Sequence, residues 1–351
     1  MKLLLNIFKW IGIVLLSIST LFTVLVFLPA KEIVPSIQPR ANTEYWAMSE
    51  NFNIAYHHLE RVDTIHKTPV VYLHGGPGGY IHSSIIETLE VLTPLGHDVY
   101  LYDQRGSGLS DRMPNYTDIK IEKHLQDLYE IITEHIQTEK VILIGQSFGS
   151  ILVAHFAARH PKLVEKMVFS APGQLEPYQI KDGYFVRLDS LYPTPDTLQF
   201  IEPYDFQQDV ARISMRPKAI AATFGALLFD AKWVSDKQMD RMLNGLASQF
   251  TKGMVCDPAN VLPEEGGGGL YAFLAGNNDD FPEARPAMRT VQAPALVLQG
   301  QCEYHSYYHG YEYVDVFPNG QYQFIDGAGH EIWWEQQEAY QEAIVTFLNG
   351  D

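Results

Sequence analysis

Short apolar runs alternate with helix-like stretches along most of the chain from about residue 43. The runs are bounded by glycine or polar residues, as strands of a sheet are, and they cover 52–58, 69–73, 99–102, 141–144, 164–169, 295–298 and 322–325. Apolar positions at helical spacing predict helices over 121–136, 150–160 and 335–348. Continuous apolar strands alternating with helices predict an α/β fold, with a mostly parallel sheet covered by helices on both faces.

The regular alternation stops in the interval 173–290. Three stretches there have helical spacing, at 204–215, 217–229 and 236–250. An acidic pair, Glu264 and Glu265, then precedes four glycines. A segment of this size between two sheet strands is interpreted as an inserted helical cap. The predicted core therefore comprises residues 43–172 and 291–351.

The N-terminus carries a longer apolar run. Residues 10–28 hold no charged side chain, and a helix rising about 1.5 Å per residue over that length just spans a hydrocarbon core of roughly 30 Å. Three interpretations compete: an uncleaved signal anchor, a cleaved signal peptide and a buried helix. The sequence before Ala30 is a poor cleavage site. The anchor, a transmembrane helix within residues 1–30, is therefore favoured.

The bases that flank this run predict its orientation. Lys2 and Lys9 lie on its N-terminal side, which predicts a cytoplasmic N-terminus and an extracytoplasmic catalytic domain. Lys31 and Arg40 on the other side weaken that prediction. Residues 31–42 contain prolines and are predicted to be an extended tether. If the segment were cleaved, the protein would be secreted.

The bulk composition excludes some classes of protein. Hydrophobic residues make up 46% of the 351 residues, enough for a sizeable core. The 42 acidic and 25 basic residues give a formal net charge of −17, which argues against nucleic acid as a partner. Cys256 and Cys302 leave two states open, one bridge or two buried thiols. The sequence has no CxxC, HExxH or GxxxxGK[ST] spacing, so neither a metal nor a cofactor is predicted.

The segment from Gly145 to Gly149 has the pattern Gly-x-Ser-x-Gly around Ser147. It follows a predicted strand and opens a predicted helix, which is the context that a nucleophile elbow requires. A turn this sharp needs small residues two positions either side of the serine, and both are glycine. The pattern alone occurs by chance in glycine-rich turns, but the context favours Ser147 as the nucleophile of a serine hydrolase.

A serine hydroxyl needs a base, and the base needs an acid to orient it. His330 lies in a glycine-rich loop after strand 322–325, and Glu303 lies three residues after Gly300, in the loop after strand 295–298. The chain order serine, acid, histidine is the one used in folds of this kind. Glu176, after strand 164–169, is the alternative acid.

Two backbone N–H groups are needed to stabilise the oxyanion of acyl transfer. One is predicted at Phe148, immediately after Ser147. The other is predicted at Gly76, in the glycine-rich run that follows strand 69–73. Asp103 and Arg105 follow the next strand, and a structural role is predicted for them, in which they pair and brace the loops beneath the site; direct interaction with the substrate is the alternative.

Together these motifs resemble the α/β-hydrolase superfamily, over about residues 45–172 and 290–350. The runs 74–79, 103–110 and 145–149 look like the prolyl aminopeptidase (proline iminopeptidase) branch. The resemblance implies Ser147, Glu303 and His330 as the triad, with Gly76 and Phe148 as oxyanion donors. Three departures stand out. The elbow reads Gly-Gln-Ser-Phe-Gly, where the branch commonly has Gly-Gly-Ser-Trp-Gly, and Glu303 replaces the usual aspartate. The N-terminal anchor is not typical of the cytosolic members of the branch.

In that branch, acidic side chains of the cap hold the free amine of the substrate. The resemblance therefore implies Glu264, Glu265 and Glu176 as candidates for amine binding, although for each residue alone a solvated acidic face is the favoured interpretation. The favoured function is an aminopeptidase that releases N-terminal proline or small apolar residues from small peptides. A carboxylesterase of the same fold and a catalytically silent, membrane-tethered binding protein are the alternatives.

Overall fold

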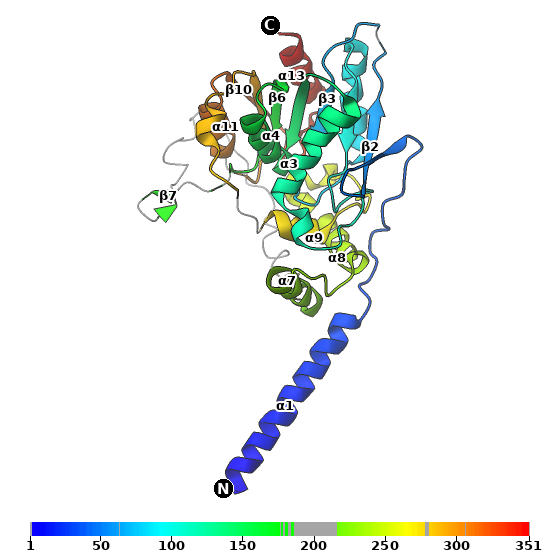
Figure 1. Ribbon diagram of the computed structural model, residues 1–351, viewed down its shortest axis with the longest axis vertical. Coiled ribbons are helices and arrows are strands. Elements are labelled where there is room, and N and C mark those ends of the chain that lie inside the picture. Colours follow the sequence, from blue (N-terminus) through cyan, green and yellow to red (C-terminus); the bar gives the residue numbers. More distant parts are fainter. Residues whose placement is uncertain are drawn as a thin grey trace.

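The computed structural model describes residues 2–62, 64–175, 177, 180–181, 184–185, 216–277, 281–305 and 307–350 (Figure 1). The predicted helix over 204–215 and the candidate acid Glu176 lie outside this described part.

One eight-stranded sheet forms the centre of the molecule. Its strands lie in the order β1 (Thr43–Ala47), β2 (Asn53–Leu59), β4 (Val99–Tyr102), β3 (Val70–Leu73), β5 (Val141–Gln146), β6 (Val164–Ser170), β9 (Ala295–Gly300) and β10 (Gly320–Ile325). β2 is antiparallel to both neighbours, and the other pairings are parallel. The mostly parallel sheet predicted from the sequence is confirmed. A short hairpin, β7 (Ile180–Lys181) and β8 (Tyr184–Phe185), stands apart from it.

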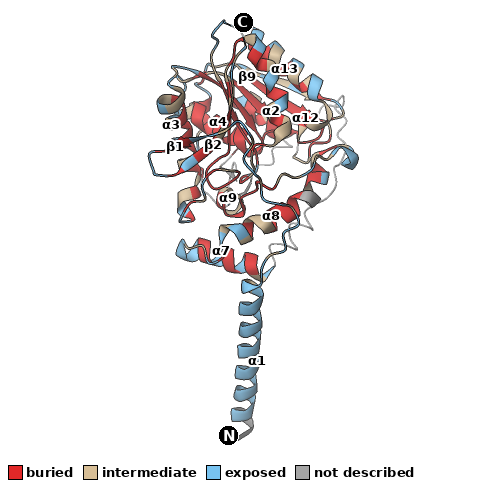
Figure 2. Ribbon diagram, turned by 90° about the vertical axis from the view of Figure 1, so that its right-hand side faces the viewer, coloured by how far each residue is buried: buried red, intermediate tan, exposed pale blue. Residues whose placement is uncertain are grey.

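Helices cover both faces of this sheet because its strands are apolar on both sides. In β5, Leu143 belongs to one buried cluster and Ile144 to the other, as alternation along a strand requires. The first cluster includes side chains of α3 (Ile121–Glu130), α4 (Phe148–Arg159) and α11 (Tyr308–Val316). The second includes side chains of α2 (Ser83–Leu89), α12 (Ile332–Glu335) and α13 (Gln337–Asn349). Figure 2 shows α3 and α4 on one side of the sheet and α2, α12 and α13 on the other, with their buried residues toward the sheet.

Residues 171–294 leave the sheet after β6 and return at β9, the next strand in the sheet. They leave β6 at the carboxyl edge of the sheet, where they can cover the site, and they enter the parallel strand β9 at the opposite edge. Within the described part they form α7 (Pro217–Phe229), α8 (Asp236–Phe250), η4 (Thr251–Met254), η5 (Pro258–Asn260), α9 (Leu270–Gly276) and α10 (Arg285–Met288). The remaining short helices are η1 (Glu90–Leu95), η2 (Thr117–Ile119) and the π-helix η3 (Ile131–Ile136), which continues α3.

Helix α1 (Lys2–Phe27) projects from the end of the molecule that carries α7 and α8 (Figures 1 and 2). Among the described helices, its segment Leu5–Phe27 is the one long and apolar enough to cross a membrane, and none of it is buried in the fold. A signal sequence has the same length and composition, so the helix is a candidate span.

The predicted tether after α1 is extended, but it does not stand away from the domain. The Ala30 N–H donates to Gln238 Oε1 (2.5 Å), and the Ile37 N–H donates to the Gly266 carbonyl (3.1 Å). Arg40 forms an ion pair with Glu265. Residues 30–40 are therefore held along α8 and the glycine-rich segment before α9.

Cys256 and Cys302 form a disulfide, with an S–S distance of 1.98 Å. From the sequence alone, a disulfide and two unpaired thiols were both possible. The bond joins the segment between η4 and η5 to the loop that follows β9. It therefore fixes part of the insertion to the loop that carries Glu303.

Candidate active site

Ser147 occupies a sharp turn between β5 and α4, with φ 51° and ψ −115°. A side chain at Gly145 would put its Cβ 2.5 Å from the Gly149 carbonyl oxygen, and one at Gly149 would put its Cβ 2.8 Å from the His74 carbonyl oxygen. Only glycine fits at both positions. The strand, strained turn and helix are the arrangement that a nucleophile elbow requires.

His330 and Glu303 lie side by side and are both buried. His330 Nδ1 is 2.7 Å from Oε1 and 2.9 Å from Oε2 of Glu303. Glu303 Oε1 also accepts the His305 N–H (2.9 Å), which holds the carboxylate in place. The imidazole thus directs Nε2 toward the cavity, where both His330 and Ser147 line the wall.

The charge on Glu303 outweighs the burial of His330. Burial alone lowers the pKa of an imidazole, because it disfavours the cation. The nearby carboxylates of Glu303 and Glu331 oppose this, and the pKa of His330 is raised above its usual value. An imidazole tuned this way accepts a proton readily and holds it as a stabilised cation.

The glycine-rich run after β3 passes directly beside Ser147. A Cβ added to Gly75 would lie 2.9 Å from Ser147 Cβ, so the backbone of this run forms the wall next to the hydroxyl. Gly76 lines the same cavity. Phe148 is the first residue of α4, so its N–H has no partner within the helix. The two predicted oxyanion donors therefore lie in two segments that border Ser147 in space: Gly76 in the glycine-rich run after β3, and Phe148 at the start of α4.

The predicted pairing of Asp103 with Arg105 is wrong. Asp103 accepts the N–H groups of Ile81 and Leu109, both at 2.7 Å. The buried guanidinium of Arg105 instead binds Asp127, with Nε 2.6 Å from Oδ2. The sequence separation of Arg105 and Asp127 hid this pairing, because Asp127 lies on α3 and only the fold brings it close. Asp103 and Arg105 still brace loops at the carboxyl edge of the sheet, but each does so through its own partners.

The cavity above Ser147 has a volume of about 200 Å³. Much of its wall is apolar and comes from α8, α9 and α12, with Leu243, Ala247, Phe250, Phe273 and Trp333. Two carboxyl groups, Glu264 and Glu331, interrupt this apolar lining. Within the described part of the chain, no group of three or more His, Cys, Asp or Glu side chains is arranged to hold a metal ion.

Burial raises the pKa of both carboxyl groups to about 7. The Tyr80 hydroxyl donates to Glu264 Oε2 (3.0 Å) and opposes the shift at Glu264, while Glu265 adds to it. At Glu331 the His330 ring opposes the shift, and Glu264 is the next charge that raises it. The charge of Glu264, which lies between β6 and β9 in the sequence, thus contributes to the raised pKa of Glu331, in the loop of His330.

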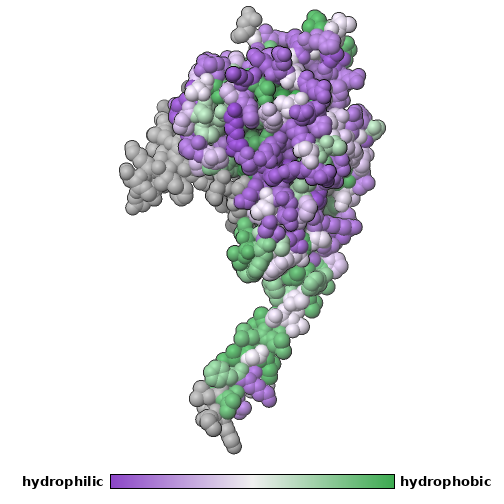
Figure 3. Space-filling view, viewed as in Figure 1, coloured by the Kyte–Doolittle hydropathy of each residue, from purple (hydrophilic) through white to green (hydrophobic). Residues whose placement is uncertain are grey.

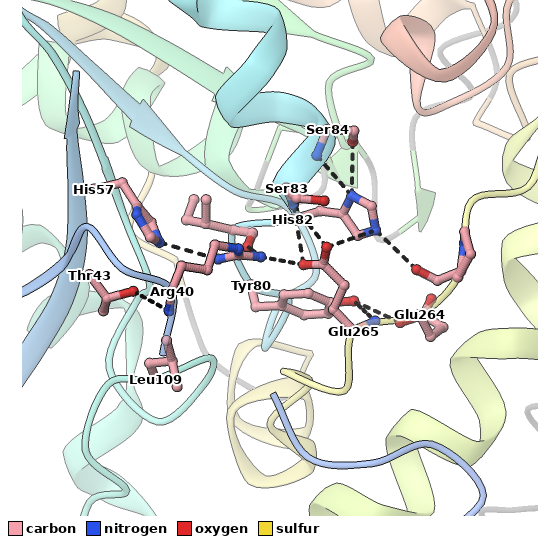
Figure 4. A network of polar contacts seen from close by, with 12 residues as sticks. Arg40, Thr43, His57, Tyr80, His82, Ser83, Ser84, Leu109, Glu264 and Glu265 are labelled. Carbon is pink, nitrogen blue, oxygen red and sulfur yellow. Dashed lines mark hydrogen bonds and ion pairs between the residues drawn. The ribbon is translucent and has the colours of Figure 1, made fainter. Parts of the chain in front are cut away.

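The other two predicted amine-binding residues lie elsewhere. Glu265 is adjacent to Glu264 in sequence, but its carboxylate binds Arg40 of the tether and accepts the Ser83 N–H (3.2 Å), as Figure 4 shows. Tyr80 stands between the two acids, since its hydroxyl donates to Glu264 and accepts the Glu265 N–H (2.8 Å). Glu176 lies outside the described residues.

Glu331 and Tyr304 belong to the site and were not anticipated. The Tyr304 hydroxyl is 3.5 Å from His330 Nε2 and is hydrogen-bonded to Ser147. Each residue directly follows a predicted triad member, Glu303 or His330. That adjacency was the only signal in the sequence, because the backbone direction that turns these side chains into the cavity cannot be deduced from residue types.

Comparison with known proteins agrees with this geometry. The model of the alpha/beta hydrolase fold family matches residues 68–337. A proline iminopeptidase of Saccharolobus solfataricus is 22% identical over 84% of this chain and 88% of its own length. One of Heyndrickxia coagulans is 25% identical over 81% and 91%.

Among solved structures, an esterase from Rhodococcus sp. ECU1013 superposes with a TM-score of 0.61. It is 16% identical and covers 88% of this chain and 99% of its own. At that identity the likeness concerns the fold alone. The sheet, the elbow and the family match together lead to one conclusion: the chain belongs to the alpha/beta hydrolase fold family and is similar to prolyl aminopeptidases.

Proposed function

We propose that this hydrolase is a serine aminopeptidase that releases N-terminal proline or another small apolar residue from small peptides. The observation that carries the proposal is the pair of half-buried carboxyls, Glu264 and Glu331, in the apolar cavity that also holds Ser147 and His330. Carboxyls drawn from water into an apolar cavity favour a cationic partner or a proton. The ammonium group of a peptide N-terminus supplies that partner beside the bond to be cut.

In the proposed acylation, His330 Nε2 takes the proton of the Ser147 hydroxyl while the oxygen attacks the first carbonyl carbon of the peptide. The N–H groups of Gly76 and Phe148 stabilise the resulting oxyanion. His330 then gives its proton to the leaving amine, the C–N bond breaks, and an aminoacyl ester on Ser147 remains. Glu303 stabilises the imidazolium and holds its tautomer.

Deacylation repeats these steps with water in place of the serine hydroxyl. His330 takes a proton from water, whose oxygen attacks the ester carbonyl. The C–O bond to Ser147 then breaks, and His330 returns the proton to the serine oxygen. The free amino acid leaves, and its ammonium group is released from the two carboxyls.

A comparison of two substrates tests the amine site. Prolyl naphthylamide carries the ring nitrogen, whereas cyclopentanecarbonyl naphthylamide has the same ring size without it. Glu331→Gln and Glu264→Gln should each raise KM for the prolyl substrate by about tenfold or more, because each removes one charge contact with the ammonium inside the cavity. Glu265→Gln is the matched control, because its carboxylate binds the tether. Equal effects of the first two variants on both substrates would exclude amine binding.

The second candidate is a carboxylesterase, and the apolar wall of the cavity favours it. Carboxyls with pKa values of about 7 are partly protonated at neutral pH and then accept a neutral acyl group. A wild-type enzyme that hydrolyses butyryl esters and none of a panel of aminoacyl naphthylamides would establish this alternative.

We further propose that α1 anchors the protein in a membrane with the catalytic domain on the extracytoplasmic side. Its length and exposure support a span. The Cys256–Cys302 disulfide supports an oxidising compartment. Arg40, which weakened the prediction from flanking bases, is bound to Glu265 within the fold and does not act as a free juxtamembrane base.

Cell fractionation tests the anchor and its orientation. The full chain should remain in the membrane pellet after an alkaline carbonate wash. Protease added to intact spheroplasts should degrade the catalytic domain, while a cytoplasmic marker survives. Release by carbonate would contradict the anchor, and protection from protease would contradict the orientation.

A further inference from the structure

We propose that α7 and the turn that follows it form a second contact with the bilayer, lying at the boundary between lipid headgroups and acyl chains. This inference rests on the membrane anchor proposed above. It assigns a function to an apolar surface that catalysis does not use. We call this surface the α7 face; it consists of Ile220, Phe224, Leu227, Leu228, Phe229 and Trp233.

The α7 face is apolar and exposed on a helix that is also buried on its other side. Ile220, Phe224 and Leu228 recur every four residues and are 45%, 50% and 62% exposed. Ala222 and Ala226, on the opposite side of α7, are 0% and 2% exposed and belong to the core. The helix therefore packs one apolar side into the fold and presents a second apolar side outward, where it is free to enter the boundary of a bilayer.

Aromatic rings extend this face beyond the end of α7. The ring of Phe229 stacks on that of Trp233 with centroids 5.2 Å apart, and Phe224 lies 5.6 Å from Trp233. Trp233 is 49% exposed, so a large part of the indole lies outside the fold. Tryptophan and phenylalanine are the side chains that favour the interfacial region of a bilayer.

The α7 face lies at the end of the candidate span. The Lys218 ammonium donates to the carbonyl oxygens of Val26 (2.7 Å) and Leu28 (2.6 Å), which binds the start of α7 to the end of α1. In Figure 2, α7 extends sideways from that end. Figure 3 shows hydrophobic surface over α7 next to hydrophobic α1, whereas most of the catalytic domain on this side is hydrophilic. A bilayer crossed by α1 would meet α7 at its surface.

The charges around α7 differ from those of the whole chain. Residues 216–241 hold five basic and three acidic side chains, whereas the full sequence has 25 basic and 42 acidic ones. Of the five bases, Arg216 and Lys237 are exposed, whereas Lys218, Lys232 and Arg241 bind groups of the fold. Basic groups beside an apolar face favour anionic headgroups, so the chemistry identifies a lipid surface as the occupant rather than another acidic protein surface.

Spin labels on the full chain in vesicles of phosphatidylcholine and phosphatidylglycerol test the proposal. Both native cysteines are in the disulfide, so Leu228→Cys and Phe224→Cys each offer one reactive thiol. Leu16→Cys, within α1, reports the anchor. Val62→Cys is the aqueous control: Val62 is 77% exposed and precedes Lys67, which binds Asn349 near the C-terminus, at the end opposite α1.

Collisions with oxygen, which concentrates in lipid, are compared with collisions with a water-soluble nickel chelate. Labels at 228, 224 and 16 should favour oxygen, and the label at 62 should favour nickel. Nickel access at 228 and 224 equal to that at 62, with 16 in lipid, would overturn the α7 contact and leave the anchor intact. Nickel access at 16 would overturn the anchor itself. Spin–spin broadening at 228 that dilution with unlabelled protein removes would identify a second copy as the occupant and overturn the proposal.

Discussion

The backbone of Ser147 holds a conformation that a side chain disfavours, with φ 51° and ψ −115°. Such positions cost on the order of 1–3 kcal/mol and persist where the surrounding structure enforces them. Here β5, α4 and the run beside Gly75 enforce it, and the hydroxyl is presented to the cavity as a result. Stability is therefore given up at the residue on which the proposed chemistry depends.

Two substitutions at Ser147 separate these effects. Ser147→Ala should lower turnover by at least about 10³-fold, since it removes the proposed nucleophile. Ser147→Gly should be equally inactive but should relieve the strain and raise Tm by roughly 2 °C, about 1 kcal/mol in a chain of this size. Activity assays and thermal unfolding in detergent measure both. Unchanged labelling of Ser147→Ala by a fluorophosphonate would show that the nucleophile lies elsewhere, and an unlabelled wild type would support the silent binding protein.

Glu303 should matter less than Ser147, because it orients the base and takes no part in bond formation. Glu303→Gln should lower kcat by about 10²- to 10⁴-fold, since the amide presents the wrong hydrogen-bonding pattern to His330 Nδ1. His330→Ala, compared in the same assay, should lose at least as much. A fully active Glu303→Gln enzyme would transfer the role to another acid, and Glu176 is the one to test.

The proposed amine site predicts a pH dependence that differs between substrates. Glu264 and Glu331 bind an ammonium only when ionised, and each has a pKa of about 7. The substrate amine loses its proton near pH 8. For prolyl naphthylamide, KM should fall as pH rises toward 7 and should rise again above about 8.

A neutral ester separates this effect from catalysis. Protonation of His330 lowers kcat for both substrates at low pH, because the base must be neutral to accept a proton. The KM of a butyryl ester should stay flat between pH 6 and 9. Parallel KM profiles for the ester and the prolyl substrate would mean that neither carboxyl binds the amine.

At the scale of elements, the Cys256–Cys302 disulfide joins the insertion to the loop of Glu303 across a sequence separation of 46 residues. Closing a loop of that length lowers the entropy of the unfolded chain, by about 4 kcal/mol in the chain-entropy treatment. Its second consequence is local, because Cys302 directly precedes the acid that orients His330.

The double variant C256S/C302S should therefore unfold at a clearly lower temperature and have a lower kcat. Calorimetry and activity assays under non-reducing conditions measure the two effects. The variant is also the control for reductant, which should destabilise the wild type and leave the variant unchanged. A wild type with an unaltered Tm in reductant would show that the bridge contributes nothing to stability.

Elements with strong periodicity were predictable, and those set by tertiary contacts were not. All predicted strands occur, with ends shifted by at most two residues. The continuous apolar runs among them must be buried on both faces, and the interior of the sheet provides that burial. β1 went unnoticed, since the edge strand has a mixed pattern in which only Trp46 is buried. The predicted helix over 121–136 changes to a π-helix after Glu130, and the final helix breaks at Gln336, where φ is −132°. No proline or glycine, the residues that usually indicate a helix break, stands at either position.

At the scale of the whole molecule, chain order and loop position were enough to predict the site residues that follow strands of the sheet. They were not enough to predict which side chains of residues 171–294 enter the cavity. Ser147, Glu303 and His330 follow strands whose carboxyl ends meet at one edge, so their proximity followed from the fold class. Glu264 and Glu265 are neighbours in sequence but have different environments. Glu264 lines the cavity, whereas Glu265 forms an ion pair with Arg40 of the tether. The packing of the tether determines which of the two carboxylates is bound to Arg40. The sequence did not indicate this packing, because an extended segment has no hydrophobic periodicity.

That packing makes a prediction about the whole molecule. The tether connects α1 to the catalytic domain, and Arg40 fixes it through Glu265, through the Ile81 carbonyl (3.2 Å) and through His57 Nε2 (3.2 Å). Glu265→Ala keeps both tryptic sites of the tether, Lys31 and Arg40, but removes the carboxylate that holds Arg40. The freed segment should admit the protease, since cleavage requires several residues of unprotected backbone.

Trypsin should accordingly release the catalytic domain from membranes several-fold faster in Glu265→Ala than in the wild type. Glu44→Ala is the matched control, because this exposed carboxylate lies just past the tether and binds only the Tyr56 hydroxyl (2.7 Å) among its described contacts. The released domain should keep its activity, since Glu265 does not line the cavity. Equal release rates in all three proteins would mean that other contacts, such as Ala30 with Gln238, hold the tether without Arg40, and the ion pair would then have no part in fixing the domain on its anchor.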